Sequence, residues 1–131
     1  MFRPPHRPVE RPSDNVRGVN EQDWNFPFEE PLHEVFPQLH GAQNAWMSQI
    51  DSLQAPDRKT HELIRMVVTV TLRNAAGVQR HARLAHEVGA TWEEILGSIM
   101  LTTPGLGVLP AVEAIPHARA GYEEAREAER E

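Results

Sequence analysis

The side chains of this chain that could carry chemistry are histidines and carboxylates, because the sequence holds seven histidines and no cysteine. Without a thiol, the chain can form no disulfide, thiolate metal site or thiol redox cycle. Imidazole titrates near neutral pH, and an adjacent carboxylate can fix its tautomer and raise its basicity. A histidine and a carboxylate in one apolar pocket would therefore suit decarboxylation, lactone isomerisation or keto–enol proton transfer, provided that a cation holds the substrate.

The spacing of the histidines does not predict a metal site. His81 and His86 are five residues apart, so they do not share a helix face as ligands four residues apart would. No His-Glu-x-x-His run occurs in the sequence. We therefore expect no metal and no cofactor. A metal-dependent hydrolase or oxygenase that uses His61, His81 or His117 is the least favoured of the functions considered.

Stretches with helical periodicity must position these groups. Apolar residues at three- and four-residue steps predict a helix from residue 38 that ends at Pro56. The next helix, 57–74, has Asp57 as its expected N-cap, and apolar residues cover most of its circumference after residue 63. This pattern predicts a central buried helix. A third helix, 76–88, should stop at Gly89 in a left-handed conformation.

Thr91 and Glu94 have the spacing of a capping box, in which each side chain bonds the backbone of the other residue. They predict the start of a further helix, which the run 104–107 should break. A last helix should run from Leu109 into the tail, with a kink at Pro116. No strand pattern of any length is present, so the expected fold class is all-α.

The N-terminal part of the chain is rich in proline. Seven of the eleven prolines lie within residues 1–40, which excludes a continuous helix or a central strand there. We expect an extended arm over residues 1–22, followed by one all-α domain over residues 23–131. The arm could be solvated or could wrap a neighbouring subunit. The aromatic segment 24–28 could fill the core, or could form a pocket wall or a subunit contact.

The charge and hydropathy of the chain exclude some classes of partner. A formal net charge of −6 argues against nucleic-acid binding, which depends on basic residues that neutralise phosphates. The longest apolar run, 66–72, is far shorter than the ~20 residues of a membrane span. The N-terminus has no apolar core of a signal peptide. The expected location is therefore the cytoplasm, with no membrane partner.

Three stretches of the chain resemble a known superfamily. They read Asp-Arg-Lys-Thr-His-Glu-Leu-Ile at 57–64, His-Ala-Arg-Leu-Ala-His-Glu-Val-Gly-Ala-Thr-Trp-Glu-Glu-Ile at 81–95, and Gly-Val-Leu-Pro-Ala at 107–111. Their order and spacing are similar to those of the carboxymuconolactone decarboxylase and alkylhydroperoxidase D-like superfamily. The resemblance implies a helical bundle with a central helical hairpin, and an obligate homo-oligomer, often a trimer or hexamer.

The resemblance also implies site residues. The redox branch of the superfamily has a glutamate, a Cys-x-x-Cys pair and a histidine, which match Glu62, Asn74, Gly77 and His81 here. Because neither Asn74 nor Gly77 carries a thiol, peroxide reduction is chemically excluded. Glu62 and His81 remain as the candidate catalytic pair, and Asn74 could offer a donor and an acceptor to the same pocket.

The decarboxylase branch lacks the cysteines, as this chain does, but differs at two positions. Gly77 stands where that branch commonly has a glutamate, and His61 replaces an arginine that would anchor a substrate carboxylate. Another arginine could supply that anchor, at position 65, 73, 80 or 83. The candidate substrate-binding residues are therefore Asn74, Arg65, Arg80, His61, His117 and Trp46.

These observations favour two candidate functions. The favoured one is a cofactor-independent lyase, decarboxylase or isomerase that acts on a small carboxylated or lactone substrate. The alternative is a non-catalytic oligomeric binding or scaffold protein of the same fold. In both cases we expect a homo-oligomer, because a chain of this length needs partner subunits to cover a helix that is apolar nearly all round.

Overall fold

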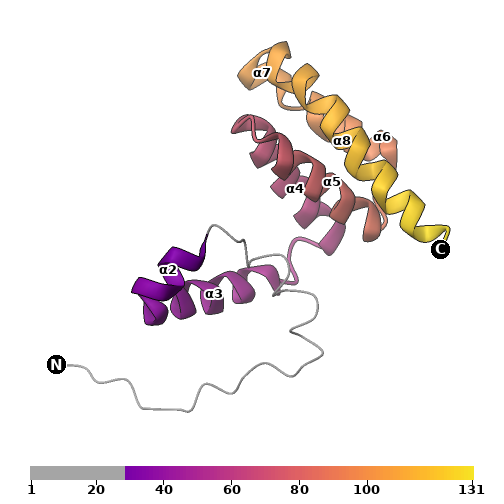
Figure 1. Cartoon of the computed structure of the whole chain (residues 1–131). Helices are drawn as coiled ribbons and strands as arrows, with labels where there is room; N and C mark the ends of the chain where they lie inside the picture. The colour runs from indigo at the N-terminus through magenta and orange to yellow at the C-terminus, as the bar shows by residue number, and fades with distance from the viewer. Residues whose placement is uncertain (1–28) are drawn as a thin grey trace. The chain divides into compact units, whose positions relative to one another are not determined.

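The computed structural model describes residues 29–131, and the secondary structure of this part of the chain consists of helices with no strand, which confirms the all-α class (Figure 1). The chain divides into two compact units, residues 1–53 and 54–131. Each unit is described by itself. The expected arm, 1–22, and the aromatic segment 24–28 lie outside the described residues.

The described part of the first unit consists of α2, Glu30–Val35, and α3, Pro37–Asp51. A proline lies in the first turn of each helix, where its missing N–H has no helical partner to lose. The helix predicted from residue 38 to Pro56 corresponds to α3, which already ends at Asp51. His40 is buried, and its Nδ1 lies 3.3 Å from Nδ1 of His33.

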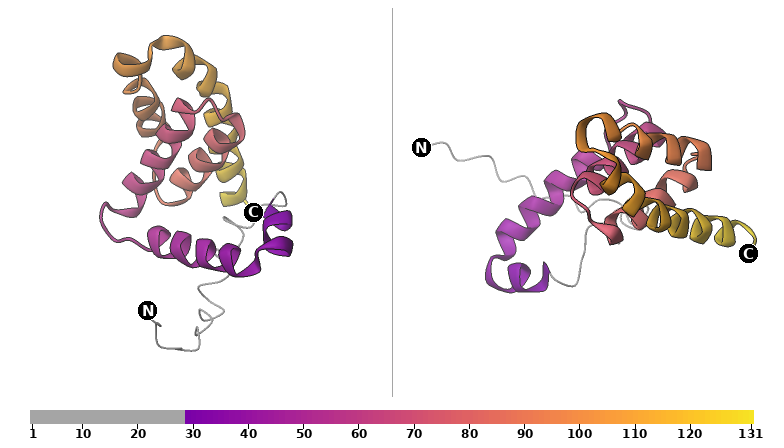
Figure 2. Two further views of the ribbon diagram at one scale, coloured as in Figure 1. Left: turned by 90° about the vertical axis from the view of Figure 1, so that its left-hand side faces the viewer. Right: turned by 90° about the horizontal axis from the view of Figure 1, so that it is seen from above.

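The second unit consists of five helices: α4, Arg58–Thr71; α5, Ala75–Glu87; α6, Trp92–Met100; α7, Thr103–Leu106; and α8, Val108–Glu129. The helices α4 and α5 form the predicted hairpin, and α5 packs most extensively against α8 (Figure 1, Figure 2). The core contains side chains from all of the longer helices. Its largest fully buried apolar members are Met66, Val70, Val78, Ile95 and Ile99.

Small residues bring α5 and α8 close together. Every buried residue of α8 is an alanine or a glycine: Ala111, Ala114, Ala118, Gly121 and Ala125. A Cβ atom added at Gly121 would lie 2.0 Å from the backbone oxygen of Gln79 on α5. The spacing of small residues along α8 is therefore what lets its backbone approach α5. The helix continues through Pro116.

The helix-end signals of the sequence are borne out in most details. Thr91 and Glu94 form the predicted capping box, with both hydrogen bonds at 3.1 Å. Asp57 is the N-cap of α4, although its carboxylate accepts from the Thr60 hydroxyl at 2.6 Å and caps no backbone N–H. The run 104–107, expected to break the helix that Thr91 begins, follows the end of α6 at Met100 and lies partly in the short helix α7.

The helices α4 and α5 end in the same hydrogen-bond arrangement, a Schellman motif. In each, the residue after the C-cap has a positive φ: Arg73, with φ 53°, after α4, and the predicted Gly89, with φ 104°, after α5. The backbone bonds, all 2.9–3.0 Å, run from Arg73 to Val70, Asn74 to Thr69, Gly89 to His86 and Ala90 to Ala85.

This chain taken alone covers α4 only in part. Met66 and Val70 are buried, but Ile64, Val68 and Leu72 are 52%, 50% and 70% exposed. These three residues are four apart, so they form one exposed apolar stripe on α4. None of the helices in the described part of the chain is long and apolar enough to cross a membrane.

Candidate functional site

Glu62 and His81 meet across the α4–α5 hairpin. Glu62 lies near the start of α4 and His81 in the middle of α5, so the antiparallel course of the two helices sets them opposite each other. The Oε2 atom of Glu62 lies 3.2 Å from Nδ1 of His81. The glutamate side chain is 1% exposed and the histidine 15%. The hairpin thus brings the predicted pair together, with the imidazole next to solvent.

The second carboxylate oxygen of Glu62 faces two arginines of the same helix. Oε1 lies 3.3 Å from Arg58 and 3.6 Å from Arg65, which are four residues before it and three residues after it. Arg65 was among the predicted site residues, but Arg58 was not. The four-residue spacing of Arg58 and Glu62 on a predicted helix is the signal that could have identified this contact.

The surroundings of Glu62 keep it ionised. Burial by itself raises the pKa of this carboxyl, but the hydrogen bond from His81 and the positive charges of Arg65 and Arg58 outweigh burial and lower the pKa below its usual 4.5. An ionised carboxylate can only accept hydrogen bonds. The proton between the two side chains therefore resides on Nδ1 of His81, which leaves a lone pair on Nε2 when the ring is neutral.

This arrangement can move protons. A carboxylate that holds Nδ1–H fixes the orientation and tautomer of the imidazole, and it stabilises the ring when Nε2 takes up a proton. Nε2 of His81 has no partner among the described residues. The pair is thus built to act through Nε2 on a group that approaches from the solvent side.

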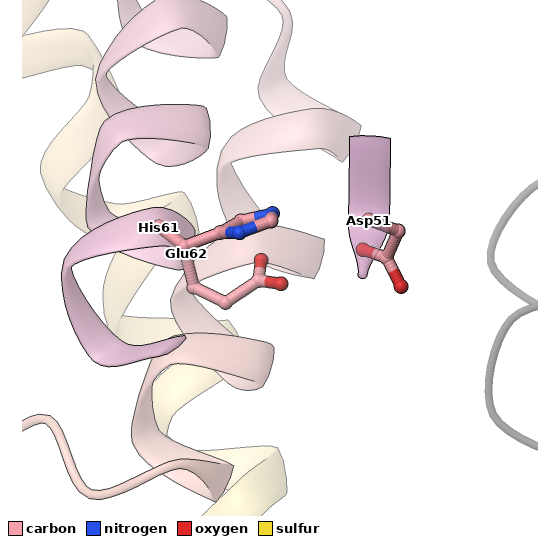
Figure 3. Close-up of side chains that lie close together, drawn as sticks. All are labelled: Asp51, His61 and Glu62. Atoms are coloured by element: carbon pink, nitrogen blue, oxygen red, sulfur yellow. The ribbon is translucent and has the colours of Figure 1, made fainter. Parts of the chain in front are cut away.

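His61 precedes Glu62 near the start of α4 and is buried (Figure 3). Arg80 is partly buried on α5. Trp46 is 64% exposed and belongs to the other compact unit. The substrate-binding roles expected for these three residues stay predictions.

Asn74 and Gly77 have structural roles at the turn between α4 and α5. The side-chain oxygen of Asn74 accepts from the backbone N–H of Gly77 at 3.0 Å and so caps α5. A Cβ atom at Gly77 would lie 2.6 Å from Cγ2 of Thr69. The positions at which the superfamily's redox branch has its thiols therefore serve helix capping and close packing in this chain.

A pocket of about 280 Å³ opens between the end of α4, the start of α5 and the first half of α8. His117, expected as a substrate-binding residue, lines this pocket, whereas His81 and Glu62 do not. The structure therefore does not bring His117 together with the predicted catalytic pair. The lining residues are Val70, Arg73, Ala75, Val78, Pro110, Glu113, Ala114 and His117.

Arg73 and Glu113 form an ion pair at this pocket. Nε of Arg73 donates to Oε2 of Glu113 at 2.9 Å, and Nη2 donates to Oε1. The hydrogen bonds from Arg73 lower the pKa of the Glu113 carboxyl. The two residues are 40 positions apart, so no local spacing could have predicted this contact.

No protein-family model matches the chain, and a search of the curated proteins and of the solved structures finds no match either. The superfamily resemblance therefore stays a prediction, and the function has to be inferred from the geometry of the described residues.

Proposed function

We propose that this protein is a cofactor-independent lyase or isomerase that acts on a small carboxylated or lactone substrate. His81 is the general acid–base and Glu62 is its positioning residue. The observation that carries the proposal is the 3.2 Å contact between Glu62 Oε2 and His81 Nδ1, made by a carboxylate that is almost fully buried. These reactions require at least one imidazole that is held in a fixed orientation and has an accessible Nε2 atom.

The same pair serves either reaction. In an isomerisation, Nε2 takes a proton from the carbon beside the substrate carbonyl, the C–H electrons form the enolate, and the imidazolium returns the proton at another carbon. In a decarboxylation, the C–C bond breaks with release of CO₂, and a protonated His81 delivers its proton to the carbanion that remains. Glu62 stabilises the imidazolium in both cases, and the nearby charges of Arg65 and Arg58 favour an anionic substrate.

We also propose a homo-oligomer, with a trimer or hexamer as the expected form. The exposed stripe of Ile64, Val68 and Leu72 supports it, because a row of apolar side chains along one helix favours burial against another chain. Further exposed apolar residues gather before and within the start of α8: Leu101, Leu106, Val108, Leu109 and Val112.

A non-catalytic binding or scaffold protein is the second candidate. It is favoured by one observation: the pocket of about 280 Å³ is lined without His81 and Glu62. In that case the ion-pair network of Glu62 would serve only to satisfy buried polar groups.

Turnover distinguishes the two candidates. A panel of small lactones and unsaturated carboxylic acids should be screened with the wild-type protein for CO₂ release and for a change in ultraviolet absorbance. We expect at least one compound to be turned over, and His81→Ala to abolish its turnover with the helical circular dichroism unchanged. The control is His33→Ala, which removes an exposed histidine of the other compact unit. Equal turnover by His81→Ala and wild type would overturn the proposal.

A further inference from the structure

The pocket between α4, α5 and α8 is lined by both apolar and polar residues. The apolar residues come from all three helices and include Val70, Val78 and Ala114. The polar residues are Arg73, Glu113 and His117. Its volume of about 280 Å³ is slightly below the ~300–1,000 Å³ of typical small-molecule sites, so only a small ligand fits. The catalytic pair proposed above makes no use of this pocket.

The left-handed backbone conformation at Arg73 indicates that the arginine side chain has a role at this position. Arg73 and Gly89 occupy the same left-handed position of two Schellman motifs in the same unit. Glycine adopts this conformation without strain, whereas any residue with a Cβ atom is strained there. The ion pair with Glu113 does not explain the arginine, because both side chains are about half exposed and exposed pairs contribute little to stability.

The hydrogen-bond donors that line the pocket favour an anionic ligand. Glu113 engages Nε and Nη2 of Arg73, so Nη1 is left to donate and has no partner among the described residues. His117 also lines the pocket and can offer a ring N–H. Ala75 is the first residue of α5, so the positive end of that helix dipole lies at the pocket as well.

The charge of Glu113 limits the ligand to a single negative charge, because a dianion would be repelled by this carboxylate at short range. The apolar walls favour a compact hydrocarbon body. We propose that this pocket binds a small monocarboxylate with a flat apolar body, whose carboxylate contacts Arg73 and His117 and whose body packs between Val70, Val78 and Ala114. The site is separate from the His81–Glu62 pair and does not depend on the function proposed for that pair.

Benzoate is a suitable probe, and isothermal titration calorimetry on the full chain measures its binding. Three compounds are the matched controls. Benzyl alcohol removes the negative charge, benzylamine replaces it with a positive charge, and inorganic phosphate removes the apolar body. We expect benzoate to bind at least tenfold more tightly than each of them. Equal or tighter binding of benzylamine, or no saturable binding of benzoate, would overturn the proposal.

Three variants locate the site. Arg73→Gly should weaken benzoate binding at least tenfold, and it should fold because glycine suits the Schellman position. Glu113→Gln should tighten binding several-fold, since it removes a carboxylate that competes for the same guanidinium. His81→Ala should leave the dissociation constant within twofold, which separates this test from that of the proposed catalysis.

Nuclear magnetic resonance gives an independent readout. Saturating benzoate should shift the backbone amide signals of Val70, Val78 and Ala114, and Arg73→Gly should remove these shifts. If Arg73→Gly changes only the thermal stability and leaves the benzoate affinity within twofold of wild type, Arg73 has a purely structural role and the proposal is wrong.

Discussion

The carboxylate of Glu62 and the imidazole of His81 face each other across the α4–α5 hairpin, with Oε2 3.2 Å from Nδ1. Glu62 is almost completely buried, while His81 keeps some access to solvent. Two arginines of α4 share the other carboxylate oxygen. This relationship makes Glu62 the residue on which both the stability of the hairpin and the proposed chemistry depend.

Replacing Glu62 by glutamine should destabilise the protein. The substitution leaves Arg58 and Arg65 beside a neutral amide, and breaking a buried pair by removing one partner commonly costs ~3–5 kcal/mol. Because both arginines are partly exposed, we expect the lower end of this range in the free energy of unfolding, measured by urea titration. The control is Glu93→Gln on the exposed side of α6. Equal urea midpoints for the two variants would show that Glu62 carries no net stabilisation.

The acid stability of the protein should depend on Glu62. Its folded-state pKa lies below the usual 4.5, so the carboxylate contributes stability above pH 4.5 that is lost as the pH falls through the folded-state pKa. The melting temperature of the wild type should therefore fall over this interval, and that of Glu62→Gln should fall less steeply. Parallel pH profiles for the two proteins would contradict this assignment.

Two glycines should respond in opposite directions to alanine. A Cβ atom at Gly121 meets the backbone of Gln79 at 2.0 Å, and a backbone cannot move aside as a side chain can. Gly121→Ala should thus lower the free energy of unfolding by ~1–3 kcal/mol or more. Gly97 in α6 has nothing within 4 Å of such an atom, so Gly97→Ala should raise it by ~0.5–1 kcal/mol through helix propensity. Chemical denaturation of Gly121→Ala and Gly97→Ala measures both changes in the free energy of unfolding.

The exposed stripe of α4 should hold the proposed oligomer together. Val68→Asp places a charge in the middle of the stripe, so it should shift the sedimentation coefficient at micromolar concentration toward that of the monomer. The control is Glu93→Lys, which changes a surface charge on α6 and should leave assembly intact. A wild-type protein that sediments as a monomer would contradict the prediction outright.

The sequence predicted much of the fold because helix ends and apolar periodicity are local signals. The capping box of Thr91 and the left-handed Gly89 lie where expected. The apolar pattern of α4 does not reveal what covers this helix, because periodicity indicates which residues are apolar and not whether this chain alone can cover them. Arg73 at the other left-handed position could not be foreseen, since arginine there contradicts the glycine preference.

The candidate site was predicted in part. Glu62 and His81 were named from a resemblance, and the hairpin does bring them together. The Arg73–Glu113 pair and the separation of His117 from His81 depend on how α8 packs against the hairpin, which no local pattern encodes. Long-range packing is thus what the sequence alone left undetermined.

The protonation of His81 tests the central claim most directly, since the proposed chemistry requires a proton on Nδ1 and a lone pair on Nε2. Nitrogen-15 spectra of protein labelled at histidine distinguish the two tautomers of the neutral ring. We predict that neutral His81 carries its proton on Nδ1, and that Glu62→Gln shifts the population toward the Nε2–H form. A neutral His81 protonated on Nε2 in the wild-type protein would contradict the account.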